Sequence, residues 1–169
     1  MSQSETVVPS VLPVSPWSVP ELVVEALPDD EREWVPGVAQ NVWMRPLLFD
    51  TVHGFWVNIT RMRTEGFISR HAHPAPVHGY ILKGQWRYLE RDWTATAGSY
   101  LFEPAGDVHT LWALPGESLT MFHISGTLID LDEAGAPLGF SDVFTRIKQA
   151  ARHYESVGLG ADYVKRYIR

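Results

Sequence analysis

Cysteine is absent from the 169-residue chain, which excludes any disulfide framework or thiolate metal site. No run of lysine or arginine occurs, and together with the net charge of -6 this argues against nucleic acid as a partner. No apolar stretch is long enough to cross a membrane, and no basic and then apolar leader opens the sequence. We therefore expect a cytoplasmic protein that binds neither nucleic acid nor membrane.

Apolar and aromatic residues are plentiful instead. The chain is 45% hydrophobic and contains seven Trp, six Tyr and seven Phe, which is enough for one well-filled domain. Histidine is the only nitrogen or sulfur ligand present in quantity, with seven copies. A nitrogen-ligated metal site in this protein must therefore be built from imidazole rings.

Strand signals dominate the middle of the chain. Four prolines among the first 20 residues predict an extended arm, which we assign to residues 1–38. From residue 39 to residue 138, short alternating segments are separated by Gly, Pro and Asp at regular intervals. This pattern is typical of an antiparallel sandwich or barrel, and it predicts an all-β domain over residues 39–138.

The pattern changes after Gly139. Ser141 and Asp142 offer a capping side chain and an acidic first turn, and Gly158 stands where a helix would end. Between them, apolar residues recur at helical spacing at Phe144, Ile147, Ala151, Tyr154 and Val157. We expect one helix packed on the outside of the barrel and a short second helix in residues 161–169, so that residues 139–169 form a C-terminal helical segment.

Three histidines have the spacing of a metal site. Because side chains alternate along a strand, His71 and His73 point to the same side. His109 follows a Pro-Ala-Gly turn that would direct a returning strand back across the first. Imidazole suits Fe(II), Zn, Cu and Ni, so the sequence predicts a metal held by His71, His73 and His109.

The two stretches that carry these histidines resemble the paired motifs of the cupin superfamily. The second motif consists of Gly98, Pro104, Gly106 and His109 at the cupin spacing. The first contains His71-x-His73 and ends at Gly84, but Val77 and His78 stand where an acidic ligand is usual. The resemblance implies a cupin antiparallel β-barrel of the jelly-roll type. The missing acid points to the three-histidine cupins, in which no carboxylate binds the metal.

Two further residues are candidates for catalysis. Glu103 precedes the turn that leads to His109, and it is either a strand-end surface carboxylate or a buried acid that accepts a proton or binds water or substrate. Tyr88 is either a core aromatic or a phenol at the barrel mouth.

Four residues are candidates for substrate binding. His78 is a fourth ligand, a hydrogen-bond donor behind the ligands, or a loop residue that faces water. His123 lies in an apolar strand, where a hydrogen-bonded core role competes with substrate binding. Trp112 could line the mouth for a flat organic substrate, and Arg61 could orient a carbonyl or phenolate, although core and solvent roles compete.

Residues 40–135 also look like 2,4′-dihydroxyacetophenone dioxygenases, on the motif from His71 to Gly84 and the segment from Tyr100 to His109. This resemblance implies non-haem Fe(II), with Zn or Ni as other loaded metals. It also implies O2-dependent cleavage of an aromatic α-hydroxyketone to 4-hydroxybenzoate and formate.

More distant likenesses are to acetylacetone-cleaving cupin dioxygenases and to the cupin domains of ChrR-type anti-sigma factors. A β-diketone dioxygenase and a non-catalytic metal-binding sensor therefore stay open. Cupins commonly pair through strand edges and exchanged arms, which implies a homodimer or homotetramer with the proline-rich arm as the exchanged element.

Overall fold

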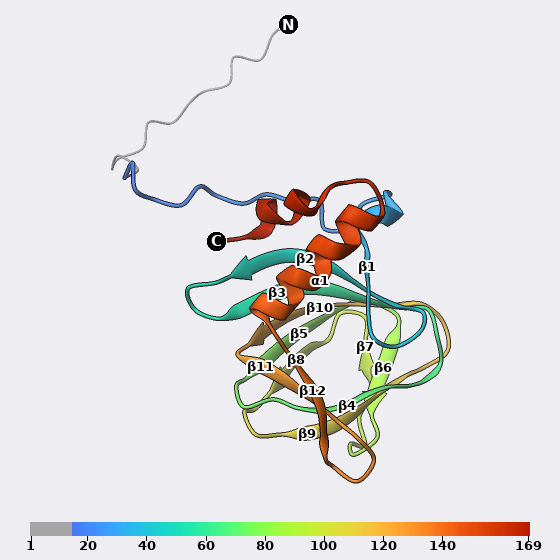
Figure 1. Cartoon of the computed structure of the whole chain (residues 1–169). Coiled ribbons are helices and arrows are strands. Elements are labelled where there is room, and N and C mark those ends of the chain that lie inside the picture. The colour runs from blue at the N-terminus through green and yellow to red at the C-terminus, as the bar shows by residue number, and fades with distance from the viewer. Residues whose placement is uncertain (1–14) are drawn as a thin grey trace, which may run out of the picture.

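The computed structural model describes residues 15–169, which form a barrel of two antiparallel sheets with the helices gathered at one side (Figure 1). Residues 1–14, which belong to the predicted arm, lie outside the described residues. The all-β class and the jelly-roll barrel with a C-terminal helix are confirmed. Within residues 15–169, no helix combines the length and the apolar character needed to span a membrane.

Each sheet contains six strands and is antiparallel throughout. In spatial order the first sheet consists of β1 (Val35–Pro36), β2 (Val42–Asp50), β3 (Phe55–Met62), β10 (Ser118–Ser125), β5 (Val77–Lys83) and β8 (Tyr100–Glu103). The second consists of β12 (Pro137–Asp142), β11 (Thr127–Leu131), β4 (Gly66–Ala72), β9 (Val108–Ala113), β6 (Gln85–Tyr88) and β7 (Ala95–Thr96). The two motifs predicted to hold the metal thus lie on strands of both sheets.

Side chains that alternate along each strand fill the barrel. Trp56, Ile81, Trp86 and Phe122 are buried in one apolar cluster, and the indole Nε1 of Trp86 donates a hydrogen bond to the Thr120 hydroxyl. The buried residues of this interior also include histidine and glutamate side chains. Because buried charged groups are rare without partners, these polar residues mark a functional site.

The C-terminal helix α1 (Val143–Ser156) lies where the sequence predicts it. Its first turn is closed by a capping box, in which the Asp142 carboxylate accepts from the Thr145 amide and the Thr145 hydroxyl accepts from the Asp142 amide. Val143, Ala150 and Tyr154 are its buried residues, whereas Phe144, which the spacing places on the buried face, is 53% exposed. The two remaining helices are the short 3-10 segments η1 (Glu31–Glu33) and η2 (Ala161–Tyr167).

A buried arginine joins both ends of the described chain to the barrel. Arg45 on β2 is 1% exposed, and its Nη1 lies 2.6 Å from the Tyr167 hydroxyl and 2.8 Å from Glu33 Oε2. Its Nη2 donates to the Glu25 carbonyl at 2.8 Å. Because Tyr167 belongs to η2 and Glu33 to η1, one guanidinium holds both helices on the outside of the first sheet.

Candidate metal centre

The predicted ligands converge because two neighbouring strands present them in register. His71 on β4 pairs with His109 on β9, and both side chains turn into the barrel. His73 follows directly after β4, where the Gly106 amide donates to the His73 carbonyl and fixes the turn against the other motif. All three imidazoles are buried, with exposed fractions of 9%, 0% and 0% for His71, His73 and His109.

Glu103, at the end of β8, reaches the same point from the opposite sheet. Its Oε2 lies 3.0 Å from Nε2 of His73 and 3.4 Å from Nε2 of His109. The Nε2 atoms of His109 and His71 are 3.1 Å apart. Ligand atoms of His73, Glu103 and His109 all lie within 4.8 Å of one another, so these three residues form a group that could bind a metal.

The outer nitrogens of the rings fix which nitrogen faces the centre. Nδ1 of His73 lies 2.8 Å from the Ala75 carbonyl oxygen, which can only accept, so Nδ1 carries the proton. Nδ1 of His109 lies 3.3 Å from the carboxylate of Asp107, which Arg91 holds in an ion pair at 2.6 Å. In their neutral forms, both rings therefore direct the lone pair of Nε2 inward, as metal-binding histidines do.

The pKa values of the histidines follow their surroundings. Burial, assisted by the positive charges of His109, His73 and Arg146, lowers the pKa of His71 to about 3. Burial also lowers the pKa of His109, and it outweighs the opposing effect of Glu103. Burial lowers the pKa of His73 too, but the adjacent Glu103 carboxylate and the hydrogen bond to the Ala75 carbonyl outweigh burial, so this pKa is raised.

These donors fit a cation. Two inward lone pairs and a carboxylate oxygen repel one another at 3.0 to 3.4 Å unless a positive charge lies between them. Nε2 of His73 is fully buried and has no hydrogen-bond partner among the described residues. A buried polar atom without a partner is costly, and a divalent metal would satisfy it together with its neighbours.

Tyr88 holds the Glu103 carboxylate in place. Its hydroxyl donates to Glu103 Oε1 at 2.6 Å, and its ring stacks on His109 with centroids 3.7 Å apart and planes 11° apart. Burial, followed by the charge of Glu103, raises the pKa of Tyr88 well above its ordinary value, so the phenol stays protonated. Tyr88 thus occupies one carboxylate oxygen and leaves Oε2 facing the histidines.

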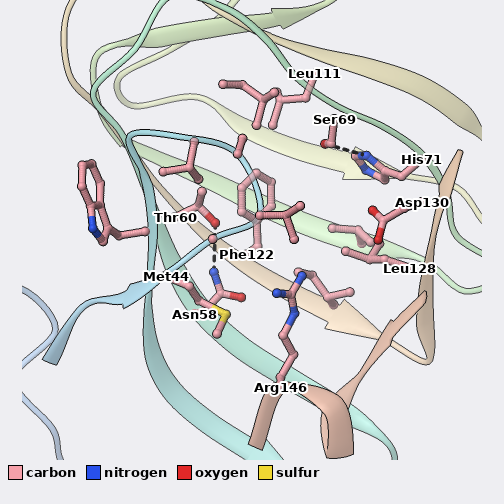
Figure 2. Close-up of a pocket in the computed structure, with 18 of the residues that line it drawn as sticks. Met44, Asn58, Thr60, Ser69, His71, Leu111, Phe122, Leu128, Asp130 and Arg146 are labelled. Carbon is pink, nitrogen blue, oxygen red and sulfur yellow. Dashed lines mark hydrogen bonds between the residues drawn. The ribbon is translucent and has the colours of Figure 1, made fainter. Parts of the chain in front are cut away.

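A cavity of about 140 Å³ opens beside this centre, and the side chains in Figure 2 line it. His71, Glu103 and Tyr88 form part of its wall. Most of the remaining wall is apolar and includes Leu111 and Phe122. Apart from the metal donors and Tyr88, the polar residues of the wall are Asn58, Thr60, Ser69, Asp130 and Arg146. An organic molecule in this cavity would therefore lie next to the metal donors in a largely dry pocket.

Two of the predicted substrate-binding histidines lie outside this cavity. On β5 the buried residues are Val77, Gly79 and Ile81, so His78 between them faces the outside. His78 hydrogen-bonds the Tyr100 hydroxyl at 2.6 Å. Its ring lies against that of His123, its cross-strand partner on β10. Strand alternation turns both side chains away from the barrel interior, so this cavity does not bring them to the metal donors, and a contact of His78 or His123 with substrate stays a prediction.

The other two predicted substrate contacts also face outward. Arg61 is enclosed by Trp34 and Trp43, with its guanidinium carbon 4.1 Å and 4.9 Å from their ring centroids, and it pairs with Glu31. Trp112 stands between the inward-facing Leu111 and Ala113 on β9, so its side chain points to the outer surface. Neither Arg61 nor Trp112 lines the cavity, and substrate binding by either residue stays a prediction.

Sequence reasoning named Glu103 as a candidate for catalysis but did not place it among the metal donors, where its Oε2 lies 3.0 Å from Nε2 of His73. Alternation along β8, where Glu103 is the buried residue, is the signal for this placement. Two other residues of the site were missed altogether. Asp130 and Arg146 also line the cavity, and no spacing in the sequence brings a helix residue into a barrel.

A family model described as the ChrR cupin-like domain matches residues 24–129, which is well over half of the chain. The protein belongs to this cupin family. The match covers both histidine motifs, and the matched segment includes every strand from β1 to β10. A search of curated proteins gives no match.

Solved structures agree with the cupin assignment. An RmlC-like cupin protein from Ralstonia eutropha is 25% identical, with a TM-score of 0.72 over 81% of this chain and 90% of that chain. A cupin-like protein of unknown function from the same organism is 28% identical, with a TM-score of 0.66 over 70% and 75%. An acetylacetone dioxygenase from Acinetobacter johnsonii, 18% identical with a TM-score of 0.68 over 83% and 99%, shares the fold.

Proposed function

We propose that this cupin is a non-haem Fe(II) dioxygenase that cleaves an aromatic α-hydroxyketone of the 2,4′-dihydroxyacetophenone type with O2. The observation that carries the proposal is the group of buried His73, His109 and Glu103, with Nε2 of the buried His71 3.1 Å from Nε2 of His109, at the wall of an apolar cavity. The products would be 4-hydroxybenzoate and formate, and both atoms of O2 enter them.

We assign the metal to His71, His73 and His109, with Glu103 beside it. Three neutral imidazoles leave the whole dipositive charge on the ion and leave coordination positions for a chelating ligand. When bound, Fe(II) supplies a Lewis-acidic, redox-active centre for an enolisable ketone and O2. Ni could occupy the same donors. Zn would occupy them without any redox chemistry, so the Zn-loaded protein serves as a loaded but inactive control.

The residues around the metal have separate tasks in this proposal. Glu103 Oε2 faces the histidines and accepts the proton that the α-hydroxyketone loses when it becomes an enediolate. The Tyr88 hydroxyl stays bound to Oε1, which holds the carboxylate in place while Oε2 gains the proton. Asp107 and Ala75 hold the rings of His109 and His73, and the apolar wall excludes water from the cleavage.

Oxygen consumption tests the proposal directly. We expect the anaerobically Fe(II)-loaded protein to take up O2 with 2,4′-dihydroxyacetophenone and to release one 4-hydroxybenzoate and one formate for each O2 consumed. The Zn-loaded protein, and Fe(II) protein carrying His73→Ala, should take up none. Oxygen uptake with acetylacetone but not with the hydroxyketone would instead assign the activity of the structurally similar acetylacetone dioxygenase.

A metal-binding sensor is the second candidate, and the ChrR cupin-like family match favours it. A sensor binds metal but has no turnover. Absence of O2 uptake with every enolisable ketone, in protein shown to hold Fe(II) by metal analysis, would reject the enzyme and leave the sensor.

A further inference from the structure

The pocket carries a positive charge that the proposed chemistry does not use. Arg146 stands in the first turns of α1, and Figure 2 shows its side chain reaching from the helix into the cavity that His71 and Phe122 also line. Arg146 lies outside residues 24–129, so the family match does not include it.

The guanidinium of Arg146 has few partners. Among the described residues, its one hydrogen bond runs from Nη1 to Oε1 of Gln149 at 2.9 Å, and its buried Nε has no partner. A guanidinium offers five N–H donors, so most of them remain free to bind a ligand. Asp130 lines the same cavity, but no ion pair within 4.0 Å joins it to Arg146.

Contacts with Gln149 and the capped start of α1 fix the position of the Arg146 side chain. Gln149 accepts from Arg146 and donates through Nε2 to the Pro36 carbonyl at 2.7 Å, which ties the guanidinium to β1. The capping box of Asp142 and Thr145 holds the helix turn from which Arg146 extends. A charged group held in this way loses little conformational freedom when it binds an anion.

Burial lowers the pKa of Arg146, although the charge of Asp130 opposes it, which reflects the cost of keeping the guanidinium away from water. A partly buried cation without a contacting carboxylate is unfavourable, and an anionic ligand would offset that cost.

We propose that Arg146 binds an oxygen anion, a phenolate or a carboxylate, at the end of the substrate remote from the metal. The apolar wall that includes Leu111 and Phe122 would then enclose the body of the ligand between Arg146 and the metal donors. This inference rests on the proposed function for the identity of the reacting end, but the binding of the remote end does not depend on turnover. It makes helix α1 a source of substrate selectivity beside the barrel wall.

Binding of unreactive probes to the Zn-loaded protein tests the inference. Acetophenone, 4-hydroxyacetophenone and 4-acetylbenzoate share one ring and ketone and differ only in the remote group, and none carries the α-hydroxyl. We expect calorimetry to give a Kd for at least one of the two acidic probes about tenfold to a hundredfold below that for acetophenone, the range for one hydrogen bond to a charged group. The tighter acidic probe identifies phenolate or carboxylate as the natural group.

Two variants assign the preference to Arg146. Arg146→Met removes the charge and keeps an unbranched side chain, and we expect it to bind all three probes with nearly equal Kd and acetophenone as the wild type does. Lys148→Met removes an exposed charge from the same helix and should keep the wild-type preference.

Equal binding of the three probes by the wild type would overturn the inference without any variant, and so would an Arg146→Met protein that keeps the preference. If the acidic preference is found but no ketone supports O2 uptake, the binding site for the anion stands and the dioxygenase proposal falls.

Discussion

At the scale of single residues, Glu103 has two candidate roles that predict different outcomes. As a proton acceptor it lies beside the metal, whereas as a ligand it would complete a set of two histidines and a carboxylate with His73 and His109. Both roles are compatible with the distances of 3.0 and 3.4 Å from its Oε2 to the two imidazoles.

Under the proposed function, we expect Fe(II)-loaded Glu103→Gln protein to keep the metal and to lose turnover by about a hundredfold to ten-thousandfold, the range for general base catalysis. The amide cannot accept the substrate proton, whereas the three histidines that we assign as ligands are unchanged. Metal content and O2 uptake measured on the same samples separate the two effects. Loss of metal equal to that of His73→Ala would make Glu103 a ligand, and His78→Gln on the outer face should change neither quantity.

The low pKa of His71 predicts how the free energy of unfolding of the metal-free protein depends on pH. Its pKa is about 3 in the folded state, against about 6.5 in an unfolded chain. The unfolded state therefore binds a proton between these values and the folded state does not. The free energy of unfolding should fall by up to about 1.4 kcal/mol for each pH unit below 6.5 on account of this group.

Urea unfolding in the presence of EDTA at pH 7, 6 and 5 measures this dependence. We expect His71→Gln to have a shallower dependence than the wild type, because the variant has no imidazole to protonate at this position. His53→Gln, which changes an exposed imidazole, should follow the wild type. An equal slope for His71→Gln and the wild type would contradict the low pKa of His71.

At the scale of secondary-structure elements, the turn between β5 and β6 depends on Gly84. This residue has φ of +71°, and a Cβ there would lie 2.3 Å from the Glu117 carbonyl oxygen. Gly98 has φ of +89° and no atom within 4 Å of the corresponding position. The two glycines therefore separate backbone strain from direct steric overlap.

We expect Gly98→Ala to cost about 1 to 2 kcal/mol, the price of left-handed backbone for a residue with a side chain. Gly84→Ala should cost more, about 3 kcal/mol or above, which is among the large effects of single substitutions. Thermal and urea unfolding compare the two variants directly. Equal losses would mean that the backbone at Gly84 moves away from Glu117 at little cost.

Much of the element scale was predictable from the sequence, because local signals determine it. The alternation of residues 55–63 and the cap at Asp142 lead to β3 and α1 as expected. The face of each strand that meets the pocket was not predictable in the same way. Arg61 and His78 carry suitable chemistry, but which face of a strand is inward depends on partners far away in the sequence.

The metal centre was predictable in part for a related reason. His71, His73 and His109 are brought together by one strand pair with a regular register, so their spacing carries the information. Glu103 comes from the other sheet and Arg146 from a helix beyond the barrel. Only the closure of the barrel and the packing of α1 bring these two residues to the pocket.

At the scale of the whole molecule, the Arg45 contacts tie the chain ends to the barrel, and Tyr167→Phe tests them. The variant removes the hydroxyl that lies 2.6 Å from Arg45 Nη1 and leaves a buried donor without this partner. We expect a loss of about 1 to 3 kcal/mol in the free energy of unfolding. Tyr80→Phe, at a residue 42% exposed, should change it by less than about 0.5 kcal/mol. Similar losses in both variants would show that Arg45 finds another partner.

Exposed apolar side chains in the segment before η1 lead us to expect that subunits associate. Trp17, Val19 and Val23 are 91%, 66% and 94% exposed on a stretch that extends away from the barrel (Figure 1). Burial of these side chains against a second copy would remove apolar surface from water. We expect light scattering to give a dimer or tetramer for the full chain and a smaller number of subunits when residues 1–20 are deleted. An unchanged number of subunits after the deletion would exclude the arm as the exchanged element.

The placement of Arg146 on α1 separates two properties that enzymes often combine in one loop. Strands β4, β8 and β9 and the residue that follows β4 carry the candidate metal donors, whereas Arg146, which we propose binds the anion, extends from a helix that contacts the barrel from outside. Under this proposal, related proteins could acquire new substrates by exchanging a single C-terminal segment, with the metal donors inherited unchanged. Chimaeras that graft foreign helices onto this barrel offer a direct route to altered substrate ranges.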